Sequence, residues 1–262
     1  MKTKIQELIH TECPWRDTLY WYPEIGSTNV KAKELALAGA PEGTLVIAGK
    51  QTAGKGRMGR SFSSPENMGM YLSLILRPDC PPQSLMHLTC AVAVAACQAV
   101  EAVSGIRPGI KWINDLVLHK KKLGGILTEL GIDPVSGLVS YAIVGIGINC
   151  LQQATDFPEE LQDIATSLLL AGAAVTPAQM AAATANALWQ LDLHKQPELM
   201  AQYKENCITL GKEVMLQRAD QTRPAFAQDL DENGCLIVRL NDGSTETIGS
   251  GEASVRGMYG YL

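Results

Sequence analysis

Apolar runs about as long as a β-strand recur between residues 40 and 150 of the chain. Glycine, proline or polar residues bound each run, which is typical of buried strands. We expect strands at 44–48, 70–76, 110–112, 116–119, 123–130 and 139–148.

Longer stretches show a helical pattern. We expect helices at 27–38, 84–104 and 160–206. Ser27 or Thr28 can cap the first helix, and Gly39 can end it. The second is rich in Ala and Val and ends at Gly105, which predicts a long buried helix.

The sequence pattern changes from helical stretches to short apolar runs after Gly211. Short strands are predicted at 214–217, 225–230, 236–240 and 244–248, with turn residues between them. This spacing is typical of a small antiparallel barrel. We therefore expect two domains, residues 1–209 with a mixed sheet backed by helices, and residues 210–262 with the barrel.

Composition and charge exclude some classes of protein. Apolar residues make up 46% of the chain and charged residues 19%, as in an ordered globular protein. The net charge of −5 disfavours general nucleic-acid binding. The longest apolar run carries Gln98 and Glu101 and is too short for a membrane span. The N-terminus lacks an apolar leader, so we expect a cytoplasmic protein.

Metal-binding and nucleophile motifs are absent from the sequence. The 7 cysteines form no CxxC pair, and the 4 histidines are scattered, so a structural zinc site is not expected. Cys90 and Cys97 fit the apolar pattern of the predicted helix and are expected to be buried. No Ser-His-Asp or Cys-His arrangement is evident.

The most informative segment is a basic, glycine-rich loop after the first strand. It reads Lys50-Gln-Thr-Ala-Gly-Lys-Gly-Arg-Met-Gly-Arg60. Glycines let backbone N–H groups approach an anion, and Lys55, Arg57 and Arg60 can neutralise phosphate charge. The segment lacks the P-loop pattern and does not open a helix as a dinucleotide fingerprint would. A solvated flexible loop is the alternative reading.

Three later segments could complete an anion site. Asn114 and Asp115 lie between two predicted strands, where Asp115 could bind Mg²⁺ or the pair could simply form a turn. Lys122 begins an apolar strand ahead of Gly124 and Gly125, where a ligand could lie against bare backbone. Residues 144–149 carry alternating glycines, which leave room for something flat or mark a bulge.

Taken together and in order, these segments resemble biotin–protein ligases. The matching motifs are Ser27-Thr-Asn29, the loop 51–60, Lys111-Trp-Ile-Asn-Asp115, residues 122–129 and Gly145-Ile-Gly-Ile-Asn149. Residues 250–256 are similar to the closing segment of the family. The resemblance implies an α+β fold of the class II synthetase and biotin ligase type, with a mixed sheet backed by helices and a C-terminal SH3-like β-barrel.

The resemblance also implies an ATP-dependent, two-step ligase. Biotin and ATP would form biotinyl-5′-AMP with Mg²⁺, and a lysine of the biotin carboxyl carrier protein would then accept the biotin. The biotin-binding residues would be Ser27, Thr28, Asn29, Gln51, Gly54, Arg57, Lys122, Gly124 and Gly125. The ATP and adenylate contacts would be Lys55, Arg57, Arg60, Phe62, Asn114, Asp115 and Asn149. The catalytic residues would be Arg57, Asp115 and Lys122, with Asp115 as the metal ligand and Asn149 at the adenine.

Some positions depart from the family pattern. Lys55 stands where Arg is usual, Ile113 replaces Pro, and Phe62 replaces a Trp found in some members. Lys55 loses bidentate contact, which predicts a weaker hold on the adenylate. The loop 53–64 is expected to be mobile until ligand binds.

The sequence leaves two other functions open. A lipoate–protein ligase is the nearest alternative, and a non-enzymatic biotin-binding module is the second. About 22 residues precede the ligase-like core, so we expect no DNA-binding domain and no repressor role. Membrane association is not expected, and a homodimer stays open.

Overall fold

The computed structural model describes residues 1–218, 221–249 and 254–257, and its main feature is a seven-stranded mixed sheet. The strand order is β1-β2-β3-β7-β6-β5-β4, with β1 and β2 parallel and each other neighbouring pair antiparallel. The strands are β1 (Leu19–Ile25), β2 (Leu45–Gln51), β3 (Gly69–Leu76), β4 (Gly109–Lys111), β5 (Asp115–Leu118), β6 (Lys121–Ile132) and β7 (Val139–Asn149).

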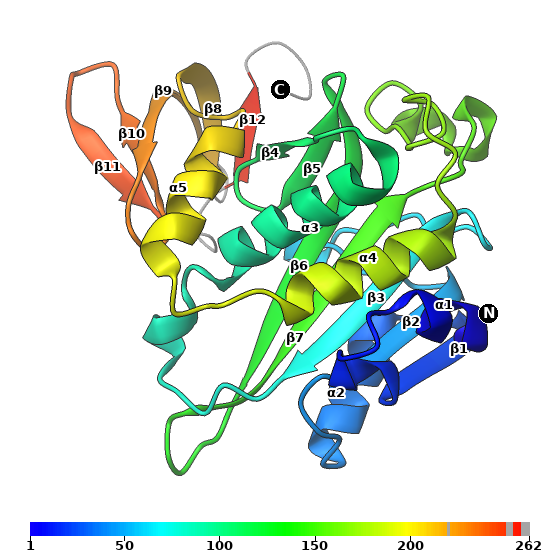
Figure 1. Cartoon of the computed structure of the whole chain (residues 1–262). Coiled ribbons are helices and arrows are strands. Elements are labelled where there is room, and N and C mark those ends of the chain that lie inside the picture. Colours follow the sequence, from blue (N-terminus) through cyan, green and yellow to red (C-terminus); the bar gives the residue numbers. More distant parts are fainter. Residues whose placement is uncertain (219–220, 250–253, 258–262) are drawn as a thin grey trace.

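Five α-helices accompany this sheet in the described part of the chain (Figure 1). They are α1 (Lys2–Leu8), α2 (Thr28–Leu37), α3 (Leu88–Ser104), α4 (Pro177–Trp189) and α5 (Gln196–Asn206). Short 3₁₀ turns are η1 (Pro14–Arg16), η2 (Arg57–Gly59), η3 (Pro82–Leu85), η4 (Ala154–Asp156) and η5 (Glu159–Leu161). The mixed sheet backed by helices confirms the predicted fold class.

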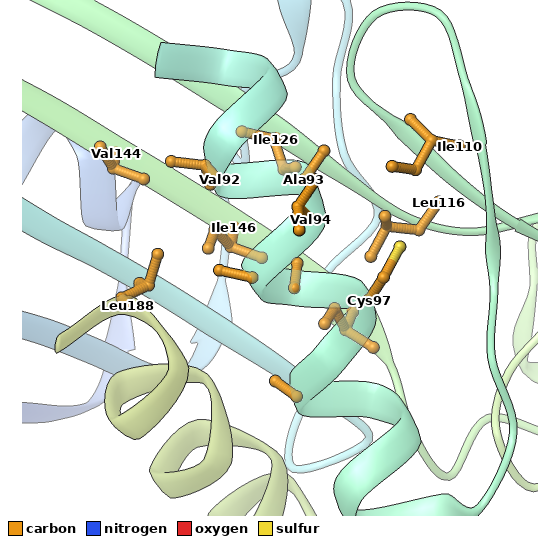
Figure 2. Packing of buried hydrophobic residues seen from close by; sticks show 14 of the residues in the cluster. Val92, Ala93, Val94, Cys97, Ile110, Leu116, Ile126, Val144, Ile146 and Leu188 are labelled. Atoms are coloured by element: carbon orange, nitrogen blue, oxygen red, sulfur yellow. The ribbon is translucent and has the colours of Figure 1, made fainter. Parts of the chain in front are cut away.

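Helix α3 forms the centre of the larger hydrophobic core (Figure 2). Its residues Val92, Ala93 and Cys97 pack with Ile126 and Ile146 of the sheet. Small side chains on α3 let the helix lie close to the strands. Burial raises the pKa of Cys97 to about 12, so this thiol behaves as an apolar side chain, as predicted.

The segment Pro82–Ser104 is long and apolar enough to cross a membrane by length and composition alone. The expectation that no segment meets this test is therefore wrong. However, 67% of its most apolar window is buried inside the protein, as in the core helix of a globular domain. The helix proper begins at Leu88, because η3 occupies the start of the predicted range.

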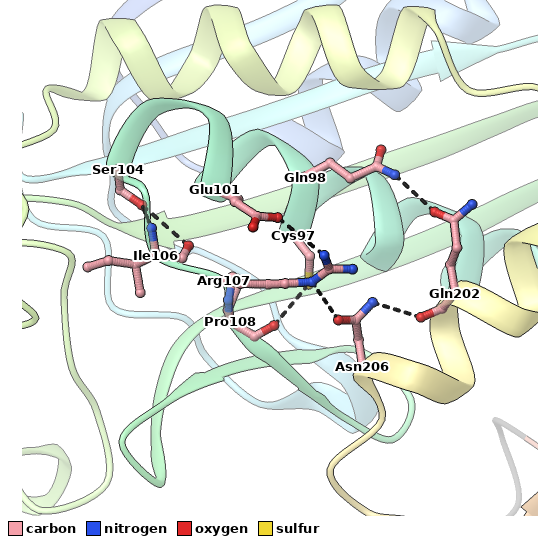
Figure 3. Close-up of polar contacts among 9 residues, drawn as sticks. All are labelled: Cys97, Gln98, Glu101, Ser104, Ile106, Arg107, Pro108, Gln202 and Asn206. Carbon is pink, nitrogen blue, oxygen red and sulfur yellow. Dashed lines mark hydrogen bonds and ion pairs between the residues drawn. The ribbon is translucent and has the colours of Figure 1, made fainter.

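Polar contacts join the end of α3 to α5 (Figure 3). Arg107 Nε donates to Asn206 Oδ1 at 2.8 Å, and an Arg107 amino group lies 3.5 Å from the Glu101 carboxylate. Gln98 Nε2 donates to Gln202 Oε1 at 3.0 Å. These contacts fix the chain just before β4, which leads to the Asn114–Asp115 turn.

Helix α2 packs on a separate, smaller core, where Ala32 and Ala36 contact Val46, Ile75 and Ile143. Arg77, directly after β3, ties down the C-terminal end of this helix. Its guanidinium donates to Ala36 O at 2.8 Å and to Ala40 O at 2.7 Å. Donation to free carbonyls at a helix end is stabilising. The start of α2 is held against the sheet by a separate contact, in which the Thr28 hydroxyl lies 2.8 Å from Ser73 Oγ of β3.

The predicted helical segment 160–206 is only partly helical. Helices α4 and α5 lie within it, but residues 162–176 are not α-helical. This stretch crosses beside β6, where Lys122 N donates to Ile164 O at 2.7 Å and Thr166 N donates to Lys122 O at 2.8 Å. In this stretch, backbone hydrogen bonds to Lys122 of β6 take the place of the predicted helical hydrogen bonds.

The C-terminal strands form a second, five-stranded antiparallel sheet in the order β11-β10-β9-β8-β12. The strands are β8 (Lys212–Arg218), β9 (Gln221–Leu230), β10 (Leu236–Arg239), β11 (Thr245–Ile248) and β12 (Ser254–Gly257). Figure 1 shows this sheet beside α5. Its closure into an SH3-like barrel stays a prediction, and residues 250–253 of the closing motif lie outside the described residues.

Candidate functional site

One cavity of about 480 Å³ collects most of the residues predicted to form the site. The predicted residues that line it are Ser27, Thr28, Asn29, Gln51, Lys55, Arg57, Arg60, Phe62, Asn114, Asp115, Lys122 and Gly125. They come from the start of α2, the basic loop, the turn before β5 and strand β6. Segments distant in sequence therefore meet at a single hollow, which is typical of a small-molecule site.

One end of the cavity consists of uncharged hydrogen-bonding groups. Gln51, at the end of β2, accepts hydrogen bonds from Thr28 N at 2.8 Å and from Thr28 Oγ1 at 3.0 Å. Its Nε2 donates to Ser64 Oγ at 2.9 Å. Ser27 is the N-cap residue of α2 by position, but its hydroxyl does not cap the helix. The Thr28–Gln51 pair gives this end a fixed arrangement of donors and acceptors.

The basic loop folds back on itself as a small hairpin. Phe62 N donates to Gly54 O at 2.9 Å, and Gly56 N donates to Arg60 O at 2.7 Å. A Cβ on Gly54 would lie 2.4 Å from Phe62 O, so only glycine allows the two arms to approach this closely. The hairpin carries Lys55, Arg57 and Arg60 to the cavity. Its mobility without ligand stays a prediction.

The ring of Phe62 occupies the gap left by a glycine of the Gly-x-Gly segment. A Cβ on Gly147 would lie 2.6 Å from the Phe62 ring. The ring also meets Tyr71 edge to face, with centroids 6.4 Å apart, and burial raises the pKa of Tyr71. The sequence predicts space for a flat group beside these glycines. At Gly147, the Phe62 ring of the protein itself fills this space.

The other end of the cavity is cationic. Lys122 Nζ lies 2.6 Å from Asp115 Oδ1 in an ion pair between neighbouring strands. Arg57 donates to Asn114 Oδ1 at 3.0 Å, and Asn114 Nδ2 donates to Ile126 O at 2.9 Å. Burial lowers the pKa of Arg57, which indicates a guanidinium with incomplete access to water. A partly desolvated cation interacts strongly with an anionic ligand.

Three predicted residues do not line the cavity. A Cβ on Gly124 would lie 2.4 Å from Gly147 O, so this glycine allows close approach of β6 and β7. Gly54 serves the hairpin. Asn149 is 5% exposed, donates to Thr166 O at 2.9 Å and accepts from Gln152 at 3.0 Å. The Asn149 amide anchors the 162–176 segment, and its contact with the adenine stays a prediction.

Other lining residues had no role in the prediction. Lys111 is 8% exposed and adds a cation to the cavity. Its place at the start of the motif 111–115 could have identified it as a site residue. Trp112 lies beside it, and its Nε1 donates to Gly234 O of the second sheet at 2.9 Å. Ile164 belongs to the segment wrongly predicted as helix. Met58 also lines the cavity, from the tip of the hairpin.

The cavity lining combines neutral hydrogen-bonding groups with cations, which suits a ligand that carries both a polar ring and phosphate. Among its described lining residues, Lys55, Arg57, Arg60, Lys111 and Lys122 are cationic, and Asp115 is the one carboxylate. Fixed cations stabilise charge that builds up during attack on a phosphate. The described residues contain no group of three or more His, Cys, Asp or Glu that could hold a metal.

Family models match both parts of the chain. Residues 21–149 match the biotin/lipoate A/B protein ligase family, and residues 209–256 match the biotin protein ligase C-terminal domain. The first match spans the strands and loops that build the cavity.

Individual proteins agree with these matches. The chain is 53% identical over 150 residues to a bifunctional ligase/repressor BirA of Bacillus spizizenii, over 57% of this chain and 46% of that protein. It is 30% identical over 258 residues to a biotin–[acetyl-CoA-carboxylase] ligase of Mycobacterium tuberculosis, over 94% and 91% of the two chains.

A solved structure has the same fold. It is the biotin protein ligase from Aquifex aeolicus in complex with biotin and ATP. The TM-score is 0.76 at 29% identity, over 91% of this chain and 98% of that one. With this fold, these relatives and the cavity described above, the chain belongs to the biotin protein ligases of the biotin/lipoate A/B protein ligase family.

Proposed function

We propose that the cavity joins biotin to ATP and then transfers the biotinyl group to a lysine of a carboxylase carrier domain. One observation carries this proposal. The Thr28–Gln51 hydrogen-bonding end and the cationic end with Arg57 and Lys122 line the same cavity. A ureido ring needs the first, and a carboxylate beside a triphosphate needs the second.

In the first step, a carboxylate oxygen of biotin attacks the α-phosphorus of ATP. The bond between the α-phosphorus and the bridging oxygen breaks, and pyrophosphate leaves with that oxygen. The reactants are anionic, so cations must hold them together. We assign this role to Lys122 and Arg57, with Lys55 and Arg60 toward the departing phosphates. The roles of Lys122 and Arg57 rest on their position beside Asp115 and Asn114.

Asp115 is the residue that fits an ATP-bound Mg²⁺. Such an ion takes one or two carboxylates together with phosphate oxygens and water, and Asp115 is the carboxylate among the described cavity residues. When bound, the ion would offset phosphate charge. The Lys122 ammonium at 2.6 Å holds the Asp115 carboxylate in place before nucleotide arrives.

In the second step, the neutral amine of the acceptor lysine attacks the acyl carbon of biotinyl-5′-AMP. The bond from that carbon to the phosphate oxygen breaks, AMP leaves, and the amine gives up a proton. The basic hairpin 54–62 covers the adenylate in this proposal and shields the mixed anhydride from water until the carrier domain arrives.

Our proposal for cellular context is a cytoplasmic ligase that does not act on DNA. The seven cysteines are unpaired, which supports a reducing compartment. The N-terminal residues Ile5 and Ile9 are buried in the core of the ligase part, so this segment serves the catalytic fold. A homodimer stays a prediction, which sedimentation of the purified protein with and without biotin and ATP would test.

The test is ATP- and Mg²⁺-dependent transfer of labelled biotin onto a purified biotin-carrier domain, with lipoate as the competing substrate. Biotin transfer that lipoate does not inhibit, and that Lys122→Ala and Asp115→Ala each abolish, supports the proposal. Transfer of lipoate would identify a lipoate–protein ligase. Tight biotin binding without pyrophosphate release would identify a non-enzymatic binding module.

A further inference from the structure

Three neighbouring strands bring Ser73, Gly145 and Leu127 into one row. Ser73 of β3 pairs with Gly145 of β7, which pairs with Leu127 of β6. The glycine leaves a gap in the middle of this row. The carboxamide of Asn29, from the first turn of α2, fills that gap, because a Cβ on Gly145 would lie 1.9 Å from Asn29 Oδ1.

The Asn29 carboxamide is fully engaged by the protein. Its Nδ2 donates to Glu129 Oε2 at 2.7 Å and to Leu127 O at 3.3 Å. Its Oδ1 accepts from Ser73 Oγ at 2.6 Å. Both amide hydrogens are used, and the residue is 5% exposed. Asn29 was predicted to bind biotin directly, but these contacts direct its amide into the sheet.

Ser73 connects Asn29 to the hydrogen-bonding end of the cavity. Its hydroxyl is fully buried and lies 2.8 Å from Thr28 Oγ1 as well as 2.6 Å from Asn29 Oδ1. The Ser73 hydrogen goes to Asn29 Oδ1, so the Thr28 hydroxyl donates either to Ser73 Oγ at 2.8 Å or to Gln51 Oε1 at 3.0 Å, and the Thr28 N–H donates to Gln51 Oε1 in both cases. A continuous chain of contacts therefore runs from Glu129 to Gln51.

Thr28 and Ser64, the two direct partners of Gln51, fix which way its amide faces. The Thr28 N–H can only donate, so Gln51 Oε1 must face α2. The Ser64 hydroxyl donates to Phe62 O at 3.0 Å, so its oxygen accepts from Gln51 Nε2. Gln51 Oε1 therefore accepts from Thr28, and one Nε2–H donates to Ser64. The second Nε2–H of Gln51 remains to donate to an acceptor atom of a ligand.

We propose that Glu129 and Ser73 are positioning residues for the biotin-recognition end of the cavity. Through Asn29 they hold Thr28, and through Thr28 they hold the Gln51 amide in its donating orientation. Neither residue needs to touch biotin. This inference rests on the proposed function, since it concerns recognition of the ring that the ligase would bind. An unsupported Asn29 would let the first turn of α2 shift, and the Thr28 N–H that sets the Gln51 amide would shift with it, which weakens binding without altering the cationic residues.

The test compares Glu129→Ala, Glu129→Gln and Ser73→Ala with wild type. We expect Glu129→Ala to raise KM for biotin by about ten-fold, as for loss of a partly buried hydrogen bond to a charged group. KM for ATP, and kcat at saturating biotin, should change less than about three-fold. Glu129→Gln should restore most of the biotin affinity, because its amide oxygen can still accept from Asn29. Ser73→Ala should shift KM in the same direction.

Thr128→Val is the matched control. Thr128 is the neighbour of Glu129 on β6, and its hydroxyl lies 2.7 Å from that of Thr89 on α3, on the opposite face of the strand. This variant also loses one side-chain hydrogen bond in the same strand, so it should affect stability alone. An equal rise in KM for biotin in Thr128→Val would overturn the inference.

Calorimetric titration of biotin into each folded variant provides a readout that does not depend on ligase activity. Unchanged biotin affinity in Glu129→Ala and Ser73→Ala would overturn the inference while leaving the proposed function intact. Equal defects in Glu129→Gln and Glu129→Ala would do the same. If Glu129→Ala does not fold, Ser73→Ala and Glu129→Gln decide the question. Absence of biotin transfer by wild type would instead reject the proposed function.

Discussion

Lys122 Nζ lies 2.6 Å from Asp115 Oδ1, and the pair stands beside Gly125, where a Cβ would lie 3.3 Å from Lys122 Cε and 3.4 Å from Asp115 Oδ1. The absence of a side chain at Gly125 gives the ion pair its space. In the proposed reaction, these two strands would supply a cation for the reacting carboxylate and a carboxylate for the ATP-bound ion.

Lys122→Ala should slow biotinyl-5′-AMP formation by about 100-fold or more, because a fixed cation that stabilises developing charge is lost. Pyrophosphate release under single-turnover conditions measures this step. Lys121→Ala is the matched control, since Lys121 Nζ contacts Gln162 O outside the cavity. A similar loss in both variants would mean that general charge matters and that Lys122 has no specific role.

Gly147→Ala should make the enzyme release biotinyl-5′-AMP about ten-fold faster, because the new methyl group would displace the Phe62 ring and with it one arm of the hairpin. Dissociation of labelled adenylate measures the effect. Phe62→Leu should give a similar rate, and combining the two substitutions should add little. Additive effects would show that the two residues act separately.

Lys55→Arg should slow dissociation of the adenylate several-fold, because a guanidinium can bind phosphate through two parallel hydrogen bonds. Lys50→Arg is the control, since Lys50 pairs with Glu24 at 2.7 Å outside the cavity. An unchanged dissociation rate in Lys55→Arg would show that Lys at this position does not weaken the hold on the adenylate.

Acid should destabilise the fold through His87, the residue before α3. Burial lowers its pKa below the ordinary value of 6.5, although its hydrogen bond to Leu193 O partly opposes this shift. The unfolded chain then binds the proton more readily, so the free energy of unfolding should fall as pH drops below about 6.5. Denaturant titrations of wild type and His87→Gln measure this. The variant should lose less stability between neutral and mildly acid pH, and parallel curves would rule His87 out.

Trp112→Phe should lower the free energy of unfolding by about 1–3 kcal/mol, because Gly234 O would lose its buried donor. The same change should slow adenylate formation, since Trp112 precedes the Asn114–Asp115 turn. Thermal unfolding and pyrophosphate release measure the two effects. Trp21→Phe, outside the cavity lining, is the control, and it should leave pyrophosphate release unchanged.

Six of the seven strands of the large sheet were predicted, because most of these six are buried on both faces. Strand β1 was missed, because residues 20–25 are partly or fully exposed and form no continuous apolar run. Continuous apolar runs such as 70–76 and 139–148 have few other uses in a globular protein. Residues 162–176 were not predictable, because their pairing partner is the backbone of Lys122, about forty residues earlier in the chain. Local pattern gives no information about such a partner.

Most charged residues of the site were predictable, although Lys111, which also lines the cavity, was given no role. Arg57, Asp115 and Lys122 meet as expected. The adenine contact predicted for Asn149 stays a prediction, since its amide bonds Thr166 and Gln152 outside the cavity lining.

Glu129 and Ser73 were missed. Their positioning role depends on Gly145 of β7, the strand that lies between β3 and β6. The order of these strands in the sheet is not evident from the sequence.

The gap at Gly145 links two positions more than a hundred residues apart in the chain. A methyl group at position 145 would collide with Asn29 Oδ1, the oxygen that accepts from Ser73. A relative with alanine at position 145 must therefore have a smaller or differently oriented side chain at position 29. Substitutions at 29 and 145 should therefore appear together among biotin protein ligases. Either change alone should be counter-selected wherever biotin is scarce.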